Sequence, residues 1–134
     1  MIYILDACAL IAFFRGEPGK EKVKEILTDF ESRVLLHAVN ACEIFYDFLR
    51  SDDEEMARSV LHDIRMANIE IVEDLSEELW IQAGRHKAKF KRISLADVIA
   101  LSLAQRFNGT LVTSDHSEFD KVADSGVCKI LFIR

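Results

Sequence analysis

Proline and glycine are scarce in this sequence, with one proline and five glycines among 134 residues. So few helix-breaking and flexible residues leave little of the chain for linkers or disordered tails. No low-complexity tract and no internal repeat divides the sequence. We therefore expect a single domain over residues 1–134, a length that can bury a substantial core.

Cysteine pairs and long apolar runs are also missing. The three cysteines, Cys8, Cys42 and Cys128, are far apart and odd in number, which argues against a disulfide framework and a cysteine zinc site. The apolar runs are too short for a transmembrane helix, and the first residues lack the features of a signal peptide. These absences predict a cytoplasmic protein without membrane contact, in which Cys8 and Cys42 are small buried apolar residues.

Positive charge is limited, and the net charge is −6. This balance argues against broad, nonspecific binding to nucleic acid, which requires a basic surface. The exception is the segment Arg85–Arg92, which contains five basic residues and no acid. This segment could bind a polyanion locally, or it could be a solvated helix end.

Short apolar runs alternate with helical patterns along the chain. Runs rich in Ile, Leu and Val predict strands at Ile2–Leu5, Val34–Leu36, Ile69–Val72, Thr110–Thr113 and Lys129–Ile133. Helical periodicity predicts helices at Glu21–Phe30, Ala41–Leu49, Glu54–Met66, Glu77–Phe90 and Leu95–Phe107. All strands except the third are nearly continuous in apolar residues, so we expect them to be buried on both faces. The pattern predicts an α/β fold with a central, mainly parallel sheet of about five strands and helices on both faces.

Four acids occupy equivalent places in this pattern. Asp6 and Asp115 directly follow predicted strands, and Glu43 and Asp97 lie in the first turns of predicted helices. Because parallel strands end at one edge of a sheet, we expect these acids to share that edge. Each acid could instead be a helix cap, since Asn40, Ser94 and Asp115 each precede an acid by three residues.

Burial favours a metal site over capping alone. Asp97 is the only charged residue in Leu95–Leu101, so its helix should be buried, and an unpaired buried carboxylate is strongly unfavourable. Asp6 ends a strand expected at the centre of the sheet and has no basic neighbour in sequence. A divalent cation would neutralise both acids, and ligands with only oxygen donors suit Mg²⁺ or Mn²⁺.

The ordered motifs resemble those of a PIN domain. They are the block Leu5–Ile11, the helix-borne Glu43, the block Ser94–Ala100 and the later Thr113–Asp115. Their order and spacing, with the length of the chain, resemble the VapC-type toxins of toxin–antitoxin pairs. The resemblance implies a three-layer PIN-like fold and an Mg²⁺- or Mn²⁺-dependent endoribonuclease that forms a homodimer and binds a cognate antitoxin protein.

The same resemblance assigns roles to the acids. Asp6, Glu43 and Asp97 match the three central acids of the family, Asp115 matches its more variable fourth, and Glu118 could share the role of Asp115. We expect Asp6 and Asp97 to bind the main ion and Glu43 to complete its shell or orient the attacking water. Asp115 would help with a second ion.

Polar and basic residues near the acids are candidates for substrate contact. Thr113 and Ser114 are expected to hydrogen-bond ligands or phosphate. The candidate RNA-binding residues are Arg15, Arg85, Lys87, Lys89, Lys91 and Arg92.

Other functions remain open from the residues alone. A non-toxin PIN nuclease in RNA processing would carry the same acids, and so would a silent nucleic-acid- or protein-binding module whose acids only cap helices. A phosphatase of the haloacid dehalogenase type would need an acid at the position of Cys8. A nucleotide-binding Rossmann domain would need a Gly-rich turn after the first strand, which is absent.

Overall fold

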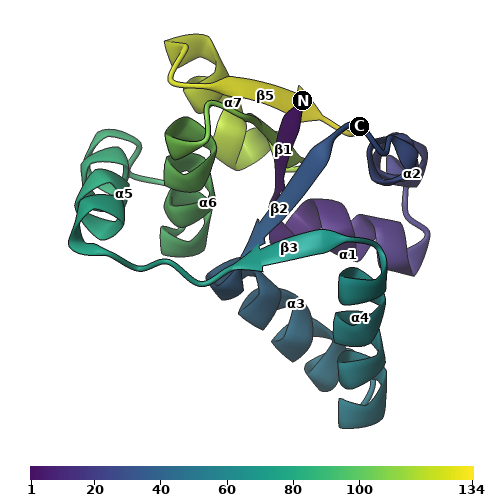
Figure 1. Cartoon of the computed structure of the whole chain (residues 1–134). Helices are drawn as coiled ribbons and strands as arrows, with labels where there is room; N and C mark the ends of the chain where they lie inside the picture. The colour runs from purple at the N-terminus through teal and green to yellow at the C-terminus, as the bar shows by residue number, and fades with distance from the viewer.

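All five strands run parallel in one sheet, in the order β3-β2-β1-β4-β5 (Figure 1). The computed structural model describes residues 1–134. The strands are β1 (Ile2–Leu5), β2 (Arg33–His37), β3 (Ile69–Val72), β4 (Thr110–Thr113) and β5 (Lys129–Phe132). The helices are α1 (Ala7–Arg15), α2 (Lys20–Thr28), α3 (Ala38–Ser51), α4 (Glu54–Met66), α5 (Glu77–Lys89), α6 (Leu95–Arg106) and α7 (His116–Ser125). The predicted α/β fold is confirmed.

The helices form a layer on each face of the sheet. Alternate residues of a strand point to opposite faces, so Leu5 and Leu36 pack in the core with α1 to α4. Their neighbours Ile4 and Leu35 pack in a second core with α6 and α7. Figure 1 shows α1, α3 and α4 on one side of the sheet and α5 and α6 on the other. None of the helices is long and apolar enough to cross a bilayer.

The strand order places a switch point next to the central strand. The chain builds β2 and β3 on one side of β1, and later adds β4 and β5 on the other. Ligand sites of open α/β sheets lie at the carboxyl ends of the strands beside such a reversal. Helix α6 leads into the start of β4, so the first turn of α6 lies at the carboxyl edge of the sheet. Asp97 therefore reaches the same edge as Asp6, although its helix follows another helix.

Two predicted features of the elements are wrong. Strand β5 is only half-buried, because it is an edge strand with a neighbour on one side alone. Helix α3 begins at Ala38 instead of Ala41, since His37 caps it by accepting a hydrogen bond from Val39 N through Nδ1, at 3.0 Å. Glu43 consequently lies in the second turn of α3, and Asn40 is not a cap.

Several apolar side chains are more exposed than the sequence predicts. Phe30 is 90% exposed because α2 ends at Thr28, two residues before the predicted end of this helix. Trp80 is 52% exposed. Cys8 and Cys42 are exposed rather than buried, since they lie on the outer sides of α1 and α3, whose neighbouring residues Ala7, Ala9 and Ala41 are the buried ones.

Candidate metal centre

Five carboxylates meet at the carboxyl edge of the sheet. They belong to Asp6, Glu43, Asp97, Asp115 and Glu118. Asp97, Asp115 and Glu118 each offer one ligand oxygen, and these atoms lie within 4.8 Å of one another. The charge of Glu43 acts on Asp6, and that of Glu118 acts on Glu43. The structure thus brings together the four predicted acids and Glu118, whose ligand oxygen lies within 4.8 Å of those of Asp97 and Asp115.

Asp6 is wholly buried at the end of the central strand. Its Oδ1 caps α1 by accepting a hydrogen bond from Ala9 N at 2.8 Å, whereas Oδ2 is buried without a partner. Burial raises the pKa of Asp6 from 3.8 to about 7; hydrogen bonding by the Thr113 side chain and by Ala9 N opposes the rise, and the charges of Asp115 and Glu43 add to it. Capping therefore accounts for one oxygen of this carboxylate and leaves the other available.

Asp97 has a carboxylate that takes no part in capping. Ser94 Oγ accepts a hydrogen bond from Asp97 N at 3.1 Å, as in a capping box. The reciprocal bond goes to another residue, because Ser94 N donates to Glu118 Oε2 at 3.0 Å. Asp97 is only 9% exposed, and burial raises the pKa of its carboxyl, with Glu118 and Asp6 adding to the effect.

Asp115 joins the end of β4 to α7. Its Oδ1 accepts hydrogen bonds from Glu118 N at 3.1 Å and from Ser117 Oγ at 2.6 Å. Thr113, which is wholly buried, fixes the turn by accepting a hydrogen bond from Asp115 N at 3.0 Å through Oγ1. Ser114 is half-buried beside this turn. Capping is thus real for Asp6 and Asp115, but it coexists with the cluster instead of replacing it.

No basic side chain of the protein neutralises these acids. None of the five carboxylates lies within 4.0 Å of a lysine, arginine or histidine nitrogen. Burial and mutual repulsion disfavour the charged forms, as the raised pKa values of Asp6, Glu43 and Asp97 show. Oxygen donors on separate elements, one with an unpartnered buried atom, fit a Mg²⁺ or Mn²⁺ ion.

The Cys8 thiol lies beside the cluster. Desolvation of the thiol by the surrounding protein atoms and the charges of Asp6 and Asp97 raise its pKa to about 12. The thiol of the metal-free protein is therefore protonated at neutral pH.

Part of the predicted basic segment adjoins the acids. Lys89, Lys91 and Arg92 line a hollow of about 270 Å³ whose far wall includes Glu118, Ser117 and Lys121 of α7. The sequence analysis did not include Lys121, although its position three residues after Glu118 puts the two on one side of α7. This hollow, which we call the basic hollow, places basic side chains directly next to Glu118.

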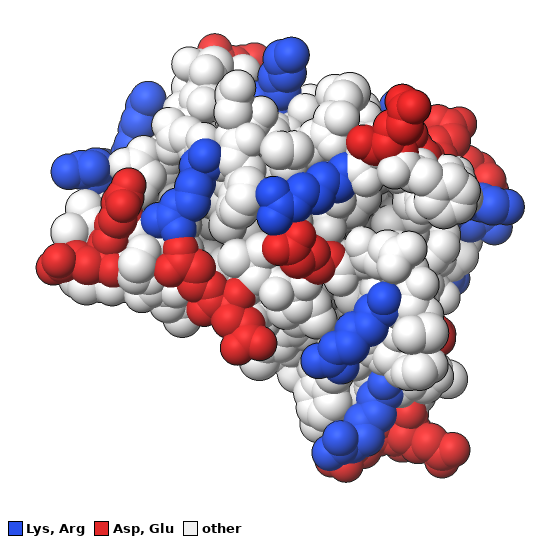
Figure 2. Space-filling view, in the orientation of Figure 1, with Lys and Arg blue, Asp and Glu red and all other residues white.

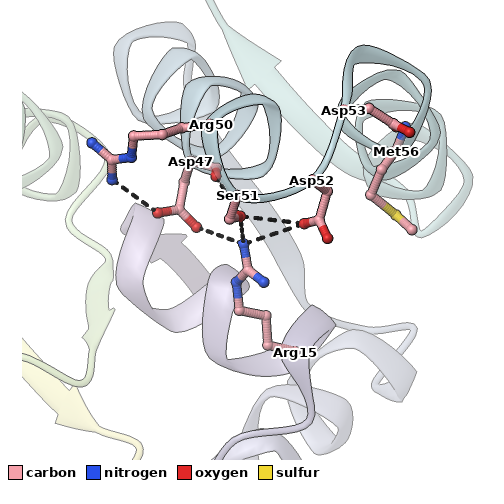
Figure 3. Close-up of polar contacts among 7 residues, drawn as sticks. All are labelled: Arg15, Asp47, Arg50, Ser51, Asp52, Asp53 and Met56. Atoms are coloured by element: carbon pink, nitrogen blue, oxygen red, sulfur yellow. Dashed lines mark hydrogen bonds and ion pairs between the residues drawn. The ribbon is translucent and has the colours of Figure 1, made fainter.

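Three other predicted RNA-binding residues have different surroundings. Lys87 holds the loop between α5 and α6, because its Nζ donates to the carbonyls of Lys91 and Ile93. Arg85 donates to Gln82 Oε1 at 3.2 Å and borders a separate hollow beside the second half of α6. Arg15 lies at the end of α1 opposite to Asp6 and pairs with Asp47 at 3.1 Å (Figure 3). The face in Figure 2 has acidic and basic side chains interspersed, without a continuous basic surface.

Comparisons with known proteins agree with this architecture. The family model of the PIN domain matches residues 3–125. No curated protein matches the chain.

Solved structures with similar folds cover the whole chain. VapBC-1 from nontypeable Haemophilus influenzae matches with a TM-score of 0.73 and 19% identity, over 99% of this chain and 98% of the other. DNA-bound VapBC from Salmonella typhimurium matches with a TM-score of 0.75 and 16% identity, over 100% and 99% of the two chains. VapBC2 from Rickettsia felis, bound to a promoter DNA fragment, matches with a TM-score of 0.74 and 20% identity, over 98% of each chain. At these identities the likeness concerns the fold.

Proposed function

Because the chain belongs to the PIN domain family, we propose that it is a Mg²⁺- or Mn²⁺-dependent endoribonuclease that hydrolyses RNA phosphodiester bonds. The observation that carries this proposal is the set of five clustered carboxylates without a basic partner in the protein. A binding module has no need for five acids without a basic partner, whereas a metal-dependent nuclease needs acids that hold a cation. In this proposal the domain comprises residues 1–134.

Each carboxylate has its own proposed role in the site. A bound Mg²⁺ or Mn²⁺ would lower the pKa of water and neutralise charge on the phosphate. Asp6 and Asp97, the two most buried acids, would hold the main ion. Asp115 and Glu118 would hold a second ion or its waters, since their oxygens lie within 4.8 Å of an oxygen of Asp97. Glu43 is half-buried at the rim and would orient the attacking water.

Secondary polar groups support this division. Thr113 keeps the Asp115 turn in place through its hydroxyl. Ser114 lies half-buried in the same turn, where it could donate to a phosphate oxygen.

The basic hollow is the proposed seat for substrate phosphate. Lys89, Lys91, Arg92 and Lys121 line it, and none of them is paired with an acid. A phosphodiester one or two nucleotides from the cleaved bond would bind there, next to Glu118. Arg15 and Arg85 are less favoured as contacts because they have partners in the protein.

We further propose that the activity is that of a toxin controlled by an antitoxin. The solved structures with this fold include VapBC toxin–antitoxin complexes. A groove of about 450 Å³ beside α1, α2 and α4 is lined by Phe13, Phe14 and Leu27, with Phe30 and Met66 at 90% and 67% exposure. Exposed apolar surface of this kind suits the apolar side chains of a partner protein. A homodimer is the proposed state of the chain itself, to be measured by light scattering.

Cleavage of RNA by the purified protein tests the nuclease. The assay compares EDTA, Mg²⁺ and Mn²⁺, with single-stranded RNA and the DNA of the same sequence, for the unaltered protein, Asp97→Asn and the control Asp47→Asn. We expect metal-dependent cleavage of RNA that Asp97→Asn abolishes and Asp47→Asn retains. Absence of both cleavage and a metal-dependent rise in melting temperature would instead favour a binding module.

A further inference from the structure

Three buried side-chain atoms in this protein have no hydrogen-bond partner: Asp6 Oδ2 and both polar atoms of Asn40. Asn40 is wholly buried in the first turn of α3. A buried polar atom without a partner is unfavourable by about 1–3 kcal/mol. Such a residue in a helix that also packs Ala41 and Ile44 into the apolar core calls for a function.

The topology places Asn40 next to Asp6. Ile4 of β1 pairs with Leu35 of β2, so two residues further on Asp6 and His37 end neighbouring strands at the same level. Asn40 follows His37 by less than one helical turn. Helix α3 also packs against α1, which Asp6 caps, and against α6, which carries Asp97.

Asn40 also shares a face of α3 with a member of the cluster. Glu43 follows it by three residues, which places both side chains on the same side of the helix, one turn apart. The unpartnered amide thus belongs to the face of α3 that carries Glu43, one turn nearer to the end of β2.

The missing partners are complementary. Asp6 Oδ2 is an acceptor without a donor, and Asn40 Nδ2 is a donor without an acceptor. An ionised carboxylate can accept about four hydrogen bonds or metal contacts. A neutral donor at Asn40 can orient Oδ2 without supplying a positive charge, so the charge of the site remains available to a cation. A lysine or arginine there would form an ion pair with Asp6 and take the place of that cation.

We propose that Asn40 is a positioning residue of the metal centre, whose amide reaches Asp6 Oδ2 through one water and fixes that carboxylate for metal binding. The proposal rests on the proposed function. With Ala9 N bound to Oδ1 and a water held by Asn40 bound to Oδ2, both oxygens of Asp6 would be fixed and would keep lone pairs for a cation. Groups that orient metal ligands in this way typically contribute 10- to 100-fold to affinity or activity.

Asn40→Leu is the test variant, because it replaces the amide by an apolar group of similar size. We expect its Mn²⁺ dissociation constant, measured by titration with electron paramagnetic resonance, to rise about 10- to 100-fold. The kcat for RNA should fall, and the KM should change little. The melting temperature of the metal-free protein, measured alongside, shows whether the variant is folded. A purely structural role predicts no change in Mn²⁺ affinity.

Two further variants keep the test decisive. Asn40→Ser retains a hydroxyl donor and cannot overpack the site, so it should keep more Mn²⁺ affinity than Asn40→Leu. Ser102→Ala is the matched control, since Ser102 is equally buried in α6 but its hydroxyl already donates to the Val98 carbonyl at 2.7 Å. Its Mn²⁺ affinity should equal that of the unaltered protein.

The outcomes separate the two proposals. Equal Mn²⁺ affinity of Asn40→Leu and the unaltered protein would overturn the role of Asn40 and leave the nuclease intact. Failure of the unaltered protein to bind Mn²⁺ would overturn the proposed function and the role of Asn40 together.

Discussion

The two ends of α1 lie beside acids in contrasting surroundings. At its N-terminus Asp6 is wholly buried, faces other carboxylates and has a pKa raised to about 7. At its C-terminus Arg15 contacts Asp47 at 3.1 Å and Asp52 at 3.7 Å, and it donates to Ser51 (Figure 3). The same helix therefore begins in a group of acids that lack a basic partner and ends in a group that has one.

The difference distinguishes acids that stabilise the fold from acids kept for a ligand. Where arginine neutralises the carboxylates, the contacts tie α1 to the end of α3 and contribute modestly to stability. Where no such partner exists, the fold carries an unfavourable electrostatic term that only an added cation would remove. Proteins tolerate such terms at functional sites, where activity requires them. The following predictions test this distinction, in order of decreasing effect.

Asp97→Asn should produce the largest effect. The amide keeps the size of the side chain but removes a charge that the proposed metal ion needs, so several kcal/mol of transition-state stabilisation are lost. We expect kcat/KM for RNA to fall about a thousandfold. Asp47→Asn, which changes an acid at the other end of α1, should retain activity within about twofold. An equal loss of kcat/KM in both variants would contradict the distinction between acids that stabilise the fold and acids kept for a ligand.

The second-largest predicted effect is on the pH dependence of stability. The pKa of Asp6 is raised from 3.8 to about 7 and that of Asp97 is also raised, so between these pH values the folded state binds more protons than the unfolded state. The stabilising effect of protonation is complete below 3.8 and is lost as the pH rises through about 7. We expect the metal-free protein to melt at a lower temperature at pH 8 than at pH 5.

Metal and mutation should each reverse this loss. Mn²⁺ at about 100 times its dissociation constant should add about 2.7 kcal/mol of stability at pH 8. Asp6→Asn should flatten the pH dependence of the metal-free protein and abolish its response to Mn²⁺, whereas Asp47→Asn should alter neither. Scanning calorimetry at both pH values measures all three proteins. A melting temperature that rises with pH in the metal-free protein would contradict the proposed electrostatics.

Substitutions in the basic hollow should have an intermediate effect, on the binding of RNA. Neutralising two phosphate contacts in Lys91→Gln/Lys121→Gln should raise KM for RNA several-fold, leave kcat nearly unchanged and reduce the salt slope of binding by about two. Lys129→Gln is the control, since this lysine starts β5 at the opposite edge of the sheet. An unchanged salt slope would mean that the hollow is only a solvated surface.

The sequence was sufficient for the architecture and for most of the cluster. Apolar periodicity predicted every strand, and the acids at strand ends were predictable because parallel topology brings those ends together. Asn40 could not be interpreted correctly, since its spacing from Glu43 imitates a capping box and only tertiary packing makes His37 the cap. Lys121 was missed because its role depends on α7 folding against the loop after α5.

Arg15 shows the same limit and provides the smallest predicted effect. Its sequence position suggested an RNA contact, yet its guanidinium lies 4.2 Å from the centre of the Phe48 ring and pairs with Asp47. Arg15→Met keeps the apolar stem but removes these charged contacts, and we expect the free energy of unfolding to fall by about 1 kcal/mol. Urea denaturation of the metal-free protein measures this change. Cleavage and its salt dependence should stay as in the unaltered protein, whereas a weaker salt dependence would restore Arg15 to the RNA-binding surface and blur the distinction between the two ends of α1.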